Sequence, residues 1–390
     1  MNPNSDYGWT TKLQHFGEEE KINGAVAPPI FQNSLFVFET MDELMNAMLV
    51  HPAGPNHHYS RVSNPTVDIA EKKIAMLEGT DACKLTGSGM AAITVAVLSC
   101  VSQGSHVVCV DTAYGPLRSL LTDYLPRFGV THTFVQGNEV EEVVSAIRPE
   151  TTVIYLESPS SLLFQLQDME AIAKVAKDRG ITTICDNTYN TALHMKPHTI
   201  GIDLICHSAT KYLGGHSDIT AGAVCGSQAR IDKIIRQEIN LVGSILHPFQ
   251  SWLLNRSLRT LDLRLKRHES TANMVAVWLE GQPEVSQVLH ISLPSFPQRE
   301  LYQKMMSGSG GLFSFIPMTQ DHRKVTAFVD ALQLFQRGVS WGGFESLALS
   351  LRVKPMGFEK ETSIVRLFCG LEDPTDLLAD LQRALPLLSD

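Results

Sequence analysis

Two short apolar runs, ITTICDN at residues 181–187 and DLICHSATKY at residues 203–212, decide the fold of this chain. Each run has the length of one buried strand and ends in polar residues. Comparable runs lie upstream at HVVCVD (106–111) and TVIYLESP (152–159), and helical patterns such as DMEAIAKVAKDRG (168–180) separate them. Apolar strands that alternate with helices predict an α/β fold, in which a mostly parallel, doubly wound sheet carries helices on both faces.

The residues before and after this core follow other patterns. Residues 1–61 contain scattered Gly, Pro and polar residues without a sustained period, and we interpret them as an N-terminal arm. The alternating strands and helices occupy residues 62–256 and predict a large domain. Short strands and two helices after them predict a smaller C-terminal α+β domain at residues 257–390.

Composition narrows the class of protein. Hydrophobic residues make up 44% of the 390 residues and charged residues only 19%, which is typical of a folded globular chain. The formal net charge of -9 argues against a nucleic-acid partner, because such a chain neutralises few phosphates. The N-terminal stretch lacks the pattern of a signal peptide, and no run approaches the ~18 apolar residues of a membrane span, so we expect a cytoplasmic protein. The cysteines show no CxxC spacing, which predicts reduced thiols and no metal site.

A run of small residues could bind a phosphate group. In TGSGMAAI (86–93), the residues around Gly89 and Met90 open an apolar helix, whose first amides can face an anion. The same pattern also occurs in ordinary tight turns. The run lacks the third glycine of a dinucleotide fingerprint and the Gly-Lys-Ser/Thr of a nucleotide P-loop.

Three further residues follow apolar runs, at the sheet edge where ligands bind in this class of fold. Asp186 could hold a cationic ring nitrogen or a metal, or it could cap the next turn. Lys211 stands among small and hydroxyl residues, as expected of a desolvated lysine that forms a Schiff base. Tyr114 could stack on a planar cofactor or simply pack in the core. Together with the phosphate cradle, these residues match the requirements of pyridoxal 5'-phosphate (PLP).

The chain resembles the Cys/Met-metabolism family of fold-type-I PLP-dependent enzymes, and within it most closely the cystathionine β-lyase branch. The resemblance extends over nearly the whole length. Its markers are YSR (59–61), NPT (64–66), GSGMAAI (87–93), DTAYGP (111–116), LESPSS (156–161), DNTYN (186–190), HSATKYLGGHSD (207–218), LRTLDLRLKRHE (258–269), SWGGFESL (340–347) and IVRLFCGLED (364–373).

This resemblance implies roles for the cofactor-binding residues. Lys211 is expected to form the Schiff base with PLP and to move protons, and Asp186 to keep the pyridine nitrogen protonated. Tyr114 is expected to stack on the ring and to serve as a proton donor or acceptor. The residues implied in phosphate binding are Gly89, Met90, Ser208 and Thr210.

The resemblance also implies how substrate and subunits bind. Arg366 is expected to grip the substrate α-carboxylate, with Ser340 beside it and Trp341 in an apolar wall. Tyr59 and Arg61 match a pair that reaches the cofactor phosphate of a neighbouring subunit. The chain is therefore expected to form a homo-oligomer, usually a dimer of dimers.

Departures from the family pattern leave the reaction open. Ser160 and Ser161, together with Trp341, resemble the β-lyase branch and favour α,β-elimination of cystathionine or a related cysteine S-conjugate to a thiol, pyruvate and ammonia. Val339 and the unusual segment 348–363 favour instead γ-elimination or γ-replacement, as in cystathionine γ-synthase or methionine γ-lyase relatives, including a specialised biosynthetic enzyme. A cofactor-sensing regulator on the same fold is a third hypothesis, although every chemical residue is retained.

Overall fold

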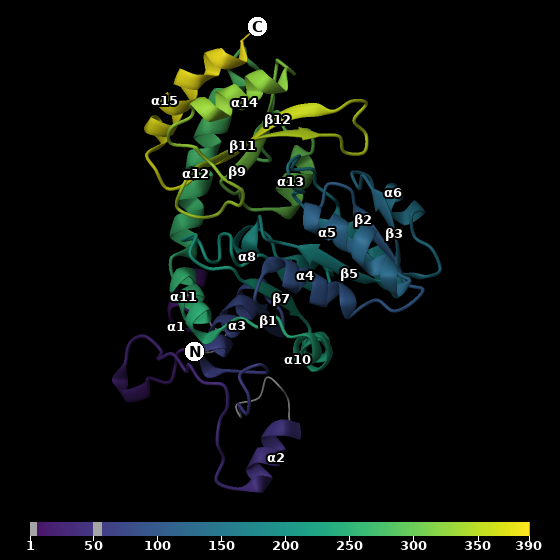
Figure 1. Ribbon diagram of the computed structural model, residues 1–390, viewed down its shortest axis with the longest axis vertical. Coiled ribbons are helices and arrows are strands. Elements are labelled where there is room, and N and C mark those ends of the chain that lie inside the picture. The colour runs from purple at the N-terminus through teal and green to yellow at the C-terminus, as the bar shows by residue number, and fades with distance from the viewer. Residues whose placement is uncertain (1–5, 50–56, 390) are drawn as a thin grey trace.

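The computed structural model describes residues 6–49 and 57–389 and contains two sheets that lie in separate parts of the molecule (Figure 1). The larger sheet has seven strands in the order β1-β7-β6-β5-β4-β2-β3. Strands β2 to β6 run parallel, whereas β7 runs antiparallel to both of its neighbours. The expected mostly parallel sheet is therefore confirmed. Its strands are β1 (Ala82–Thr86), β2 (His106–Val110), β3 (Thr131–Val135), β4 (Thr151–Glu157), β5 (Thr182–Asp186), β6 (Leu204–His207) and β7 (Gly222–Gly226).

Helices cover both faces of this sheet. Cys206 and His207 are consecutive in β6, so their side chains point to opposite faces. The Cys206 thiol contacts the carbonyl of Ala92 in one helix, and the His207 ring contacts Glu78 at the end of another. The helices around the sheet are α3 (Pro65–Glu78), α4 (Gly89–Leu98), α5 (Gly115–Ser119), α6 (Val140–Ser145), α7 (Met169–Asp178), α8 (Thr191–His194), α9 (Gln228–Ile234) and α10 (Asn240–Val242).

Local sequence explains where the two helices nearest the site begin. The Asn64 side chain accepts a hydrogen bond from the amide of Thr66, and Pro65 occupies the first turn of α3. The Ser88 hydroxyl accepts from the amide of Ala91 and caps α4 in the same way. Helix α4 starts just after β1, and α3 ends at Glu78, beside the ends of β5 and β6.

The smaller sheet has the strand order β10-β11-β12-β9-β8 and is mostly antiparallel. Buried aromatic rings, among them Phe313, Phe315 and Phe328, fill the space between this sheet and its helices. The expected smaller α+β part is thus present. Its strands are β8 (Val285–Leu289), β9 (Leu312–Pro317), β10 (Gln336–Arg337), β11 (Leu347–Val353) and β12 (Thr362–Phe368), and the helices after the large sheet are α11 (Pro248–Leu258), α12 (Leu261–Glu280), α13 (Arg299–Met305), α14 (His322–Ala331) and α15 (Pro374–Ala384).

The N-terminal arm is more ordered than its sequence indicates. It contains α1 (Trp9–His15) and α2 (Met41–Leu49), and α2 projects away from the rest of the chain (Figure 1). Helices of seven and nine residues make only about two turns, which is too short for the sustained period that sequence analysis requires. Residues 1–5 and 50–56 of the predicted arm lie outside the described residues.

A search of the described residues finds no helix that is both long and apolar enough to cross a membrane.

Candidate active site

Lys211 lies in the turn after β6, where residues from both sheets meet. Its Nζ donates a hydrogen bond of 2.5 Å to the Oγ of Ser340, which belongs to the loop before β11. The same Nζ lies 5.6 Å from the centre of the Trp341 ring. Lys211 and Ser340, which are 129 positions apart in the sequence, are therefore neighbours in space, and Trp341 lies beside them.

The charge of Lys211 is destabilised by its surroundings. Burial, together with the positive charge of Arg366, lowers the pKa of Lys211 to about 8, while Asp186 acts in the opposite direction. Arg366 lies in β12, donates from Nη2 to the Ser340 carbonyl at 3.1 Å, and has its own pKa lowered to about 10 by burial. Two cations close together at a buried site favour an anion between them, such as a carboxylate.

The loop that carries Ser340 and Trp341 has an unusual backbone. Ser340 has a φ of 82°, a left-handed conformation that side chains other than glycine rarely adopt. Gly342, with a φ of 87°, approaches the main chain of Lys211 so closely that a Cβ would lie 2.8 Å from the Lys211 carbonyl carbon. The Trp341 ring packs at 5.2 Å from the Tyr212 ring and 6.3 Å from the Tyr189 ring. Close packing therefore holds this loop against the lysine.

One buried and one partly buried carboxylate end neighbouring strands of the large sheet. Asp186 ends β5 and is in register with Glu157, which ends β4. Burial and the nearby Asp186 raise the pKa of Glu157 to about 8, and burial raises the pKa of Asp186. A cationic group at this edge would relieve the repulsion between the two carboxylates.

Glu157 was not selected from the sequence as a functional residue. Its Oε2 accepts a hydrogen bond from the amide of Tyr114 at 2.7 Å, and its Oε1 accepts from the Ser161 hydroxyl at 2.6 Å. Tyr114 itself is 44% exposed, so part of this residue remains accessible. Glu157 follows an apolar run as Asp186 does, and the same strand-end rule could have found it.

The predicted phosphate site is compact. Gly89, the first residue of α4, lies so near Ser208 that a Cβ on it would be 2.6 Å from the Ser208 Cβ. Met90 follows it, and the first amides of a helix have no partner within the helix. The Thr210 hydroxyl donates to the Ala221 carbonyl at 3.1 Å and accepts from the Ala221 amide at 3.0 Å, so it also holds its own loop in place.

Tyr59 and Arg61 lie apart from this cluster. The Arg61 guanidinium lies 4.9 Å from the Tyr59 ring centre and donates to the Oδ1 of Asn240. Among the described residues, neither contacts Lys211 or Asp186. Their expected role in the site of a neighbouring subunit stays a prediction.

The residues at the edge of the large sheet fit PLP. Lys211 can react with its aldehyde, the Asp186 carboxylate can pair with its ring nitrogen, and Gly89 lets the start of α4 lie against Ser208, where helix amides can bind its phosphate. The crystal structure of metB from Corynebacterium glutamicum superposes with a TM-score of 0.92 at 31% sequence identity and covers 100% of both chains. Fold and site together define a PLP-dependent enzyme of fold type I.

Similarity to known protein families identifies which fold-type-I family the chain belongs to. The model of the family described as Cys/Met metabolism PLP-dependent enzyme matches residues 10–386, and the chain belongs to this family. An L-methionine gamma-lyase of Pseudomonas putida is 39% identical over 389 residues, which cover 97% of each chain. A cystathionine beta-lyase-like protein of Rhizobium johnstonii is 34% identical over 390 residues, covering 98% of this chain and 97% of the relative. The cofactor and the family are thus confirmed, while the relatives differ in the bond they break.

The lowered pKa of Lys211 predicts how the protein takes up PLP. Only the neutral amine attacks an aldehyde, so the rate at which cofactor-free protein binds PLP covalently should rise with pH and reach half of its maximum at about pH 8. The visible absorbance of the bound cofactor follows this reaction. Parallel runs with N-acetyl-lysine correct for the titration of PLP itself. A midpoint near 10.5, the value of an ordinary lysine, would contradict the prediction.

Proposed function

We propose that the chain is a carbon–sulfur lyase that cleaves cystathionine or a related cysteine S-conjugate by α,β-elimination, releasing a thiol, pyruvate and ammonia. The observation that carries this proposal is the position of Trp341. Its ring lies against Tyr189 and Tyr212 and beside the Nζ of Lys211.

Each residue of the site has a task in this reaction. When bound, PLP acts as the electron sink for the substrate carbon that loses its proton. Arg366 and the Ser340 loop bind the substrate carboxylate, which turns the Cα proton towards Lys211. The Nζ of Lys211, with its lowered pKa, accepts this proton near neutral pH. Tyr114, which interacts electrostatically with Arg366, donates a proton to the departing sulfur.

Trp341 favours β-elimination over γ-elimination for a geometric reason. In β-elimination the base removes a proton from Cα alone, whereas γ-elimination also requires proton removal from Cβ. A large ring 5.6 Å from Nζ, held by two tyrosine rings, leaves the lysine little room to reach a second carbon.

One feature outside the Trp341 packing favours γ-elimination as a second candidate. Val339, next to Ser340, is 81% exposed, so this position beside the site carries neither an aromatic ring nor a packed side chain. The 39% identity to an L-methionine gamma-lyase points the same way.

The keto acid product distinguishes the two reactions. We expect purified protein loaded with PLP to release pyruvate from cystathionine, measured by mass spectrometry, because the sulfur leaves from Cβ. Release of 2-oxobutyrate would instead establish γ-elimination and refute the proposal.

A Trp341→Leu variant tests the geometric argument itself. Removing the ring gives the Lys211 side chain more room, so the share of 2-oxobutyrate should rise by several-fold, since small changes in a pocket alter discrimination by about tenfold or more. Met274→Leu, a replacement of an exposed side chain on α12, is the control and should leave the product ratio unchanged.

We propose further that the chain acts as a homo-oligomer in which Tyr59 and Arg61 reach the site of a neighbouring subunit. If so, co-expressing Arg61→Ala with Lys211→Ala should restore part of the activity that each variant lacks alone, because a mixed pair contains one site with both native residues. Recovery would be read from the rate of keto acid release. No recovery from mixed oligomers that have been isolated with two different affinity tags would refute this arrangement.

A further inference from the structure

Glu78, the last residue of α3, is buried against the large sheet and contacts residues at the ends of two of its strands. Its exposure is 0%, and its Oε1 accepts hydrogen bonds from the His207 Nε2 at 2.6 Å and from the Asn187 Nδ2 at 3.0 Å. Asn187 and His207 are also buried. One carboxylate oxygen therefore joins the ends of two adjacent strands.

The two donors adjoin the residues that face the cofactor. Asn187 directly follows Asp186 at the end of β5, and His207 directly precedes Ser208 at the end of β6. Asp186 is the candidate partner of the ring nitrogen, and Ser208 is a candidate phosphate ligand. The position of Glu78 therefore affects Asp186 and Ser208, two residues that are expected to hold the same PLP molecule.

A second set of hydrogen bonds links the same strand ends near the site. The Asp186 carboxylate accepts from the amide of Thr188 at 2.9 Å, and the Thr188 hydroxyl accepts from the amide of Ser208 at 2.8 Å. The amide of Asn187 also donates to the Cys206 carbonyl at 2.9 Å. Hydrogen bonds therefore connect the ends of β5 and β6 directly on the side of the cofactor. On the side of α3, Glu78 connects the same two strand ends.

We propose that Glu78 is a positioning residue for PLP, whose carboxylate holds the ends of β5 and β6 at the spacing that lets Asp186 and Ser208 contact the same cofactor molecule. It acts through Asn187 and His207. The inference concerns cofactor binding and does not depend on which bond the enzyme breaks.

The second carboxylate oxygen of Glu78 allows the effect of the hydrogen bonds to be separated from the effect of packing. Oε2 has no hydrogen-bond partner among the described residues, so Glu78→Gln keeps the Oε1 acceptor and loses no existing bond. Glu78→Leu has a similar size but no acceptor, so the His207 Nε2 loses its partner and the Asn187 Nδ2 keeps only its hydrogen bond to the Met195 carbonyl. The pair of variants therefore separates the hydrogen bonds from the mere filling of space.

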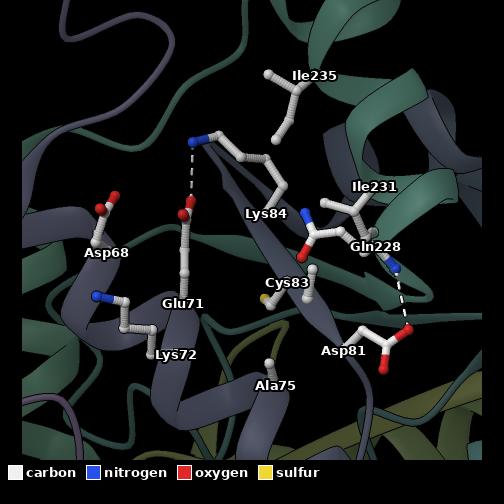
Figure 2. A pocket seen from close by; sticks show the side chains of 11 residues that line it. Asp68, Glu71, Lys72, Ala75, Asp81, Cys83, Lys84, Gln228, Ile231 and Ile235 are labelled. Atoms are coloured by element: carbon white, nitrogen blue, oxygen red, sulfur yellow. Dashed lines mark hydrogen bonds and ion pairs between the residues drawn. The ribbon is translucent and has the colours of Figure 1, made fainter. Parts of the chain in front are cut away.

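A control variant is available on the same helix. The Glu71 carboxylate accepts from the Leu85 amide at 2.9 Å and pairs with the Lys84 Nζ at 3.0 Å. It lines a cavity of about 160 Å³ together with residues of α3, β1 and α9 (Figure 2), and none of the lining residues belongs to β5 or β6. Glu71→Leu removes a carboxylate with two partners and should destabilise the protein without touching the cofactor anchors.

The experiment compares the dissociation constant of PLP and the ¹⁵N chemical shift of the ring nitrogen in protein loaded with ¹⁵N-labelled PLP. We expect Glu78→Leu to weaken PLP binding by about tenfold to a hundredfold and to move the ring-nitrogen signal towards that of unprotonated pyridine. Glu78→Gln should stay within about threefold of the native constant with a native signal. Glu71→Leu should lower the unfolding temperature only.

Other results would overturn the proposal. Equal PLP affinity and equal ¹⁵N shift in Glu78→Leu and Glu71→Leu would mean that Glu78 only stabilises the fold. Equal losses in Glu78→Leu and Glu78→Gln would exclude positioning by the two hydrogen bonds. If Glu78→Leu does not fold, Glu78→Asp replaces it, because it shortens the reach by one methylene and should weaken PLP binding in the same direction; native affinity would again overturn the proposal.

Discussion

Replacing Lys211 by alanine is expected to lower the turnover rate at least about a thousandfold, because one side chain both binds the cofactor covalently and moves the proton of the substrate. Among the described residues, Arg366 is the other cation in contact with Ser340, and it cannot take over both tasks because it stays protonated at neutral pH. The rate of keto acid release and the visible absorbance of bound cofactor should fall together.

A second lysine provides a matched control for this experiment. Burial lowers the pKa of Lys196 to about 8 as well, and its Nζ lies 3.4 Å from the centre of the Trp9 ring in the arm. Lys196→Ala should therefore retain catalysis and cofactor colour despite some loss of stability. Equal activity of Lys211→Ala and Lys196→Ala would refute the assignment of the catalytic lysine.

Replacing Glu18 by alanine is expected to lower the free energy of unfolding by about 3–5 kcal/mol, since it leaves a buried lysine without its counter-charge. Lys73 is completely buried, and its Nζ lies 2.5 Å from the Glu18 Oε1. Glu18 also accepts from Arg259 and from Asn255. Burial raises the pKa of Glu18, but Lys73 and these partners outweigh it and hold the pKa below its ordinary value. Chemical denaturation of the loaded protein would measure the loss.

The double variant Glu18→Leu with Lys73→Met separates charge from packing. If the loss comes from an unpaired buried charge, removing both charges should restore most of the stability. A double variant as unstable as Glu18→Ala would show that packing, rather than charge, holds the arm to α3. Asp262→Ala, which breaks an exposed pair with Lys266, should cost less than about 1 kcal/mol.

Two of the candidate site residues could be selected from the sequence because of where they stand relative to the strands. Asp186 and Lys211 each follow an apolar run, and the carboxyl ends of parallel strands meet at one edge of a sheet. Glu157 obeys the same rule but was missed, because its carboxylate carries no motif beyond its position. The short helices of the arm were missed because two turns give no detectable period.

By itself, the sequence determined the α/β class and the cofactor through the order of its apolar runs, small residues and polar strand ends, and the family through the resemblance of its motifs, since each of these is a pattern within a few neighbouring residues. Only the tertiary structure decided that Ser340 contacts Lys211, that Arg366 lowers the pKa of that lysine, and that Glu78 binds His207. The pairs Lys211–Ser340 and Glu78–His207 are each separated by 129 residues. Such contacts depend on how the two sheets and their loops pack together, and neither local hydrophobic periodicity nor residue propensity predicts this packing.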